Sequence, residues 1–242
     1  MLNNTFHLQS VDRGWLTLLY INIITIYLDL KIIIWIKLII KKIYKDIYSA
    51  KAEPRIIKVP KFKYITIVGK GNPNTSDTFK TAVEFLYGIS YTIKFMVKKG
   101  ETEITPVDYS VMPLEGQWWA DDMNDFIITN KDNWNWKIMI MQPDFVGIKI
   151  FGIAKEKFLQ KKKLEDPGNI VFEEIEDGLS AQFLYTGAYS DEGPFIIKLH
   201  DFIKEQGYER NSFHREIYLS DARKTDPAKL KTIIRQPIQK VK

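Results

Sequence analysis

Apolar and polar residues alternate with two different periods along the chain after residue 54. A period of two predicts an extended strand, whereas apolar residues that recur at three and four positions predict a helix. Strands are predicted over residues 55–68, 109–119, 134–142, 172–187, 214–219 and 230–237, with interruptions at Pro60 and Pro113. Helices are predicted from Ser76 or Thr75 to about Met96, over 145–162 and over 192–206.

The order strand, helix, strand, strand occurs twice, in a first unit over about 55–143 and a second over about 170–238. Within these units, 137–143 and 231–237 carry lysine, isoleucine, glutamine and proline at matching positions. A repeated element order with such matching residues indicates that the two units arose by duplication of one unit. The predicted fold is therefore α+β, with tandem pseudo-symmetric strand-helix-strand-strand units that form antiparallel sheets around a central ligand groove.

The first part of the chain differs from the rest, because residues 15–40 are its most apolar run. The uncharged part ends at Leu28 and is shorter than the ~20 residues of a membrane span. Asp29 and Lys31 each cost about 2.5–3.5 kcal/mol within a membrane helix. We interpret 1–42 as an extension, either a weak anchor or the product of a misassigned start codon, and 43–242 as the folded domain. The expected location is cytoplasmic, with membrane anchoring through the apolar run as the alternative.

Composition argues against several kinds of chemistry. The chain has no cysteine, and its three histidines are scattered without paired spacing, so thiolate catalysis is excluded and metal ligands are scarce. We therefore expect neither a metal nor another cofactor. The net charge of +5 comes from lysine clusters typical of solvated faces, and no nucleic-acid-binding motif accompanies them, so nucleic acid is not an expected partner. The sequence leaves the oligomeric state open.

The predicted strand that contains Glu216 holds the strongest candidate site. Strand alternation places Glu216 and Tyr218 on one face and Ile217 on the other, which we expect to lie under the helices. A carboxylate among aromatic rings can neutralise a planar cation. It can also act as a general acid or base, with a tyrosine as second proton carrier. The alternative without function is an exposed ion pair with Arg215, Arg223 or a lysine.

Further candidates follow from the correspondence between the two units. Glu115 falls at the position that matches Glu216, so two carboxylates are expected to face one groove. The clustered tryptophans and methionines suit either a core or an adaptable binding cleft, although only one of the consecutive Trp118 and Trp119 can line it. The expected ligand-binding residues are Tyr109, Glu115, Trp118, Trp119, Met139, Met141, Phe183, Tyr185, Glu216 and Tyr218.

Three segments stand out together, Asp108–Trp119, Ile138–Phe145 and Glu216–Asp221, the last followed by Arg235–Pro237. With them, the chain resembles the stand-alone GyrI-like small-molecule-binding proteins over about residues 42–242. The resemblance implies two fused units around a central groove. In members that serve as effector modules of drug-responsive transcription factors, a glutamate at a Glu-x-Tyr strand position contacts cationic aromatic drugs, and Glu216 stands at that position.

The resemblance implies binding of bulky hydrophobic or cationic aromatic molecules, for sequestration or detoxification. Some stand-alone members imply an alternative, a hydrolase that opens the cyclopropane of DNA-alkylating cyclopropanoid compounds. Glu216 would then activate water, and Tyr185 or Tyr218 would polarise the conjugated carbonyl. A second alternative is the effector-binding component of a transcription regulator, although the apolar extension contains no recognisable helix-turn-helix. Whether the protein is an enzyme stays open at this point.

Overall fold

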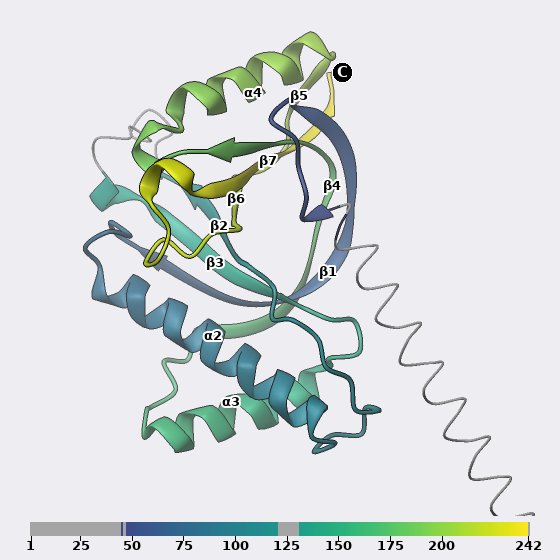
Figure 1. The fold of residues 1–242 in the computed structure, drawn as a ribbon, viewed down its shortest axis with the longest axis vertical. Coiled ribbons are helices and arrows are strands. Elements are labelled where there is room, and N and C mark those ends of the chain that lie inside the picture. Colours follow the sequence, from purple (N-terminus) through teal and green to yellow (C-terminus); the bar gives the residue numbers. More distant parts are fainter. Residues whose placement is uncertain (1–44, 46, 121–130, 242) are drawn as a thin grey trace, which may run out of the picture. The chain divides into compact units, whose positions relative to one another are not determined.

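The computed structural model describes residues 45, 47–120 and 131–241, all of which belong to the unit Ile43–Lys242. Seven strands and three α-helices lie within these residues (Figure 1). In chain order they are β1 (Arg55–Lys70), α2 (Asp77–Lys98), β2 (Leu114–Trp119), β3 (Asn135–Gln142), α3 (Ile148–Lys162), β4 (Ile170–Thr186), α4 (Gly193–Glu205), β5 (Tyr208–Arg210), β6 (His214–Tyr218) and β7 (Lys231–Lys240).

Six of the strands close into an antiparallel barrel. Their order is β4-β1-β3-β2-β6-β7, and β7 pairs again with β4 (Figure 1). The short β5 pairs with β7 outside this ring. The elements β1-α2-β2-β3 and β4-α4-β6-β7 repeat the order strand, helix, strand, strand, with α3 between them. The predicted α+β class is thus confirmed, and the two antiparallel halves join at both edges.

Some strand boundaries differ from the sequence prediction. β1 runs through Pro60 without interruption, because it pairs there with β4 alone and its pairing with β3 begins only at Lys63. A proline without an N–H is tolerated at such a one-sided position. β2 begins at Leu114, directly after Pro113, so residues 109–113 belong to a loop and not to the predicted strand. The three-residue β5 was not predicted.

Helices α2 and α4 cover the outer surface of the barrel. α2 begins after Ser76, whose Oγ accepts a hydrogen bond of 3.2 Å from the Phe79 N–H, as the capping pattern predicts. The Phe79 ring lies edge-on to Trp136 of β3, with 5.2 Å between ring centroids. On the other side of the barrel, α4 packs Leu199 against Ile234 of β7.

The strand register contradicts the expectation that Ile217 lies under the helices. Glu216 pairs with Ile234 of β7, and Ile234 packs under α4, so the helix-covered face is the face of Glu216. Ile217, one residue further along β6, faces the barrel interior and is fully buried.

Paired charges fill the barrel interior. Arg215 donates hydrogen bonds of 2.9 Å to Glu115 and 2.7 Å to Asp177, and Tyr48 also donates to Glu115. Arg235 lies 3.5 Å from the second oxygen of Asp177. Two arginines thus balance two carboxylates, as buried ions require. This network occupies the face of the strands opposite to that of Glu216.

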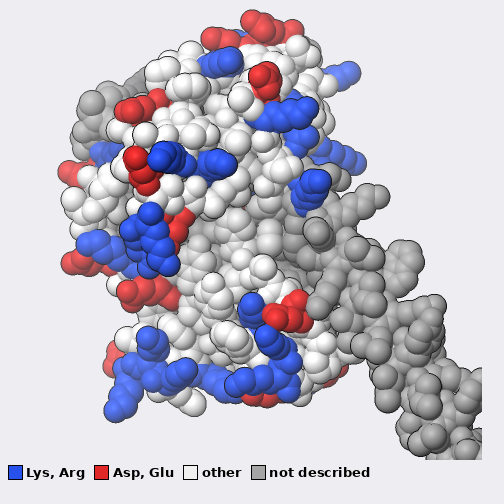
Figure 2. Space-filling view, viewed as in Figure 1, with Lys and Arg blue, Asp and Glu red and all other residues white. Residues whose placement is uncertain are grey.

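Charges on the outside are mixed in sign. Figure 2 shows lysine and arginine side chains gathered along the lower edge of the view, where α3 lies, with acidic side chains close by. Three lysines of α3 form ion pairs, Lys149 with Glu103, Lys155 with Asp166 and Lys157 with Glu101. Such exposed pairs contribute little to stability.

Within the described part of the chain, no helix combines the length and apolar character that crossing a membrane requires. The apolar run over 15–40, and with it the anchor hypothesis, lies outside the described residues.

Candidate functional site

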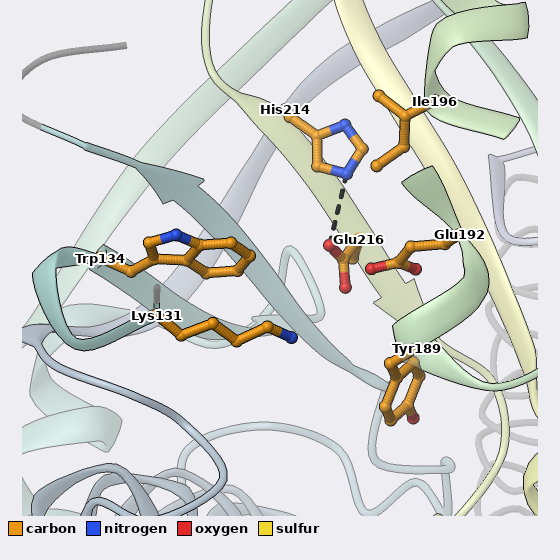
Figure 3. Close-up of a pocket in the computed structure, with 7 residues that line it drawn as sticks. All are labelled: Lys131, Trp134, Tyr189, Glu192, Ile196, His214 and Glu216. Atoms are coloured by element: carbon orange, nitrogen blue, oxygen red, sulfur yellow. Dashed lines mark ion pairs between the residues drawn. The ribbon is translucent and has the colours of Figure 1, made fainter. Parts of the chain in front are cut away.

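A small pocket opens on the helix-covered face, between β6, the start of α4 and a short 3-10 helix, η2 (Lys131–Asn133) (Figure 3). Its enclosed volume of about 20 Å³ is enough for one water molecule. Side chains from four elements and the residues beside them converge there. They are Lys131, Trp134, Tyr189, Glu192, Ile196, His214 and Glu216.

Glu216 is the carboxylate at the centre of this pocket, and it is 6% exposed. Its Oε2 accepts a hydrogen bond of 2.8 Å from the Tyr218 hydroxyl, which in turn accepts one of 3.1 Å from the Trp118 indole N–H. His214 Nε2 lies 3.3 Å from Glu216 Oε1. The site therefore combines a buried carboxylate with an oriented phenol and an imidazole.

The alternative without function, an exposed ion pair at Glu216, is wrong. Arg215 points into the barrel toward Glu115, and Arg223 pairs with Asp221. Among the described residues, no lysine or arginine nitrogen lies within 4.0 Å of the Glu216 carboxylate. Burial without a lysine or arginine partner is costly for a carboxylate, so this pocket favours a group that supplies a positive charge or a proton.

Glu192 is a second carboxyl in the pocket, which sequence analysis did not single out. It is the residue before α4, yet its side chain makes no capping hydrogen bond to the helix. Burial, followed by repulsion from Glu216, raises the pKa of Glu192 to about 10. Glu192 thus carries a proton at neutral pH. The sequence offers no signal for this, because a glutamate at a helix start is ordinarily a solvent-exposed capping residue.

Two tyrosines beside the carboxyls are neutral donors. Burial and the charge of Glu216 raise the pKa of Tyr189 to about 12. The same two causes raise the pKa of Tyr218 well above its ordinary value. Their rings meet edge to face, with 5.6 Å between centroids. Both hydroxyls therefore keep their protons at neutral pH and can donate them in hydrogen bonds.

Four other predicted residues lie near the pocket or under a helix. Trp118 and Tyr218 adjoin Glu216 through the hydrogen bonds described above. Phe183 and Tyr185 share the helix-covered face and pack in the core beneath α4. The Tyr185 hydroxyl donates a hydrogen bond of 2.8 Å to the Ala188 carbonyl, so its proton is engaged outside the pocket.

The remaining predicted residues lie away from the pocket. Trp119 stacks on Phe213, with ring centroids 4.8 Å apart, and Tyr109 packs against Phe145. Met139 and Met141 face the barrel interior together with Glu115, as their pairing with neighbouring strands shows.

The expectation that Glu115 and Glu216 face one groove is wrong. β2 and β6 are direct neighbours in the barrel, and Gly116 is the residue that pairs with Glu216. Glu115 is the neighbour of Gly116 on β2, so its side chain points to the face opposite to that of Glu216. There it forms part of the interior charge network with Arg215.

An α+β barrel with a polar and aromatic pocket beside β6 and the start of α4 is typical of proteins that bind small molecules. The sequence model of the GyrI-like small molecule binding domain matches residues 52–239. The chain therefore belongs to the family of GyrI-like small molecule binding domains.

Two solved structures from Listeria innocua resemble this chain closely. One is an uncharacterized conserved protein with a TM-score of 0.76, and the other is a protein described as a hydrolase, with a TM-score of 0.72. Each shares 36% sequence identity, covering 83% of this chain and 98% of its own. A comparison with curated proteins finds no match.

Proposed function

We propose that the protein binds a cationic aromatic small molecule at the Glu216 pocket, and that it serves to sequester such compounds. The observation that carries this proposal is the burial of the Glu216 carboxylate without a lysine or arginine partner among the described residues. A ligand cation would compensate this charge in a site from which water is largely excluded, where electrostatic attraction is strong.

The aromatic side chains support the same ligand class. Trp118 and Trp134 lie with their ring centroids 5.8 Å apart, and the Lys131 ammonium lies 5.0 Å from the Trp134 ring centroid. A ring that already attracts an ammonium can attract a ligand cation in its place. Figure 3 shows the Lys131 side chain extending into the same space as the two carboxyls.

The pocket must widen before a ligand enters. Its enclosed volume of about 20 Å³ is far below the roughly 300–1,000 Å³ of drug-sized sites. Widening requires separation of side chains from η2, β6 and the start of α4, since these elements supply the walls. A ligand that binds the wider state better would shift the population toward it.

Fluorescence titration with methylene blue, a permanent planar cation, tests the proposal. Glu216→Gln should weaken binding roughly thirtyfold or more, because loss of one partner from a desolvated charge pair costs about 2 kcal/mol or more. Glu174→Gln is the matched control, since Glu174 forms an exposed pair with Lys61. The neutral analogue phenothiazine should bind both variants alike. Equal affinity of methylene blue for wild type and Glu216→Gln would refute charge recognition.

Hydrolysis of a cyclopropanoid is a second candidate function, favoured by a water-sized space beside Glu216. Glu216 would take a proton from water as the oxygen bonds to a cyclopropane carbon. The ring C–C bond would break, and its electron pair would move into the conjugated carbonyl, which takes a proton from a tyrosine. Glu216 would then return its proton to that tyrosine. Tyr218 is better placed than Tyr185, because its hydroxyl contacts Glu216 directly.

Mass spectrometry separates the enzyme from the binder. A hydrolase should convert a cyclopropanoid into a product heavier by one water, and Glu216→Gln should abolish that conversion while Glu174→Gln retains it. Absence of product at high protein concentration would remove this function for the compound used. The effector-component alternative and the cytoplasmic location stay predictions.

A further inference from the structure

We infer that Glu192 and Glu216 hold one proton between them, and that a cationic ligand enters the pocket in exchange for this proton. The inference rests on the proposed function and deepens it, because it explains how the pocket stays stable when empty and makes binding depend on pH. Nothing in the strand pattern around Glu216 indicates such a partner.

The geometry brings the two carboxyls together from opposite walls. Glu192 precedes α4, and Glu216 lies on β6; Figure 3 shows their carboxyl groups pointing toward one another. Their residues are 8% and 6% exposed. Two like charges in such a dry space cannot both remain ionised, so one proton is retained. The pair then carries one negative charge.

The orientation of Glu192 has no structural explanation in the helix that follows it. Its Oε2 is buried and has no hydrogen-bond partner among the described residues. The side chain does not cap α4, although the helix start would accept a carboxylate. A buried carboxyl oxygen that finds no donor among the other described groups indicates that the proton shared with Glu216 provides its hydrogen bond.

The groups that face the pair determine how it titrates. Tyr189 and Tyr218 are neutral at physiological pH, as shown above. The remaining titratable groups near the pair are His214 of β6, Lys131 of η2 and Tyr185 of β4. Asp191 of η3 (Tyr189–Asp191) is exposed and accepts a hydrogen bond from the Ser190 hydroxyl.

Among the described residues, Lys131 is the lysine that lines the pocket, and His214 is the imidazole beside the pair. The Lys131 ammonium opposes the rise in the pKa of Glu192 without reversing it. His214 lies closer, 3.3 Å from Glu216. Any test must accordingly separate a proton held by the carboxyl pair from one held by this imidazole.

A ligand cation changes the balance in the pair. Its charge favours the doubly ionised state, so the retained proton leaves as the cation enters. The pKa of Glu192 is about 10 in the empty pocket, and its ordinary value is 4.5. Between these two values, the carboxyl holds its proton in the empty pocket and can release it when a cation binds. Within that interval, full exchange makes cation affinity rise up to about tenfold per pH unit. A neutral ligand releases no proton and shows no such rise.

Isothermal titration calorimetry with methylene blue, in two buffers of different ionisation enthalpy, counts the released protons. Wild type at pH 7.5 should release close to one proton per bound dye, and Glu192→Gln should release none and bind with little dependence on pH. Asp191→Asn, one residue away, is the matched control and should behave as wild type. A pH dependence that persists in Glu192→Gln but disappears in His214→Asn would assign the proton to the imidazole and overturn the inference.

Infrared spectroscopy of the unliganded protein tests the shared proton without any ligand. A carboxylic acid band should be present at pH 7.5 in wild type and absent in Glu192→Gln, and in Glu216→Gln it should titrate at lower pH. Absence of the band from wild type would overturn the inference that the pair shares a proton.

Failure of methylene blue to bind would overturn the proposed function and the exchange, while the infrared band would still decide whether the pair shares a proton. Circular dichroism verifies that each variant is folded.

Discussion

The Tyr218 hydroxyl donates a hydrogen bond of 2.8 Å to the Glu216 carboxylate two residues earlier on β6. Both side chains point to the helix-covered face, because residues two apart on a strand share a face. The Trp118 indole holds the same hydroxyl from the neighbouring strand. The carboxylate is thus fixed in direction before any ligand arrives, which lowers the entropy cost of binding.

Tyr218→Phe should destabilise the protein. The substitution removes the donor to Glu216 and leaves the Trp118 indole N–H without its acceptor, which costs about 1–3 kcal/mol for buried groups. Urea unfolding followed by circular dichroism measures the change. Tyr91→Phe is the matched control, since Tyr91 is 44% exposed and should change stability by less than about 0.5 kcal/mol. Equal effects of the two substitutions would contradict the role of this hydrogen bond.

Stability should respond to Glu192 with a definite sign of pH dependence. The folded protein binds a proton at Glu192 up to a pKa of about 10, whereas the unfolded chain releases it at the ordinary value. The folded state therefore holds more protons in between, and this group's contribution to stability falls as pH rises. Glu192→Gln should gain stability relative to wild type between pH 5 and 10, by at most about 1.4 kcal/mol per pH unit. Thermal unfolding at several pH values measures it, and a constant difference would contradict the retained proton.

Arg215→Met should be strongly destabilising. It leaves Glu115 and Asp177 buried without their closest cation, and breaking a buried ion pair in this way costs about 3–5 kcal/mol. Arg223→Met is the control, because Arg223 forms an exposed pair with Asp221 worth about 0–1 kcal/mol. Urea midpoints of the two variants give the comparison. A small loss for Arg215→Met would show that the barrel interior relaxes around the unpaired acids.

Gly116→Ala should displace the tryptophan that supports the site. A Cβ at Gly116 would lie 2.9 Å from the Trp118 indole nitrogen, so the indole must move and its bond to Tyr218 must lengthen. Overpacking of this kind costs about 1–3 kcal/mol. Gly152→Ala in α3 is the opposite case, since its Cβ would meet nothing within 4 Å, and it should gain up to about 1 kcal/mol. Chemical unfolding and Trp fluorescence report both changes.

Most of the fold but only part of the candidate site could be predicted from the sequence. Periodicity located the helices and the longer strands, and the Glu-x-Tyr pattern correctly placed Glu216 and Tyr218 on one face. The pattern could not predict which face of the strands the helices cover. It also could not predict the β2–β6 register, in which Glu216 pairs with Gly116, so that Glu115 points into the barrel. Glu192 could not be predicted as a site residue, because its partner Glu216 is distant in sequence and only the folded structure sets the start of α4 beside β6.

The closed ring of strands separates the residues that stabilise the fold from most of the residues that shape the pocket. Every barrel strand has a neighbour on both sides, and the interior is filled by its own matched ions. Changes in η2, in η3 or in the first turn of α4 can therefore reshape the pocket without unpairing a strand. Substitutions in these short segments should therefore change which molecules fit the pocket while leaving the ring of strands intact.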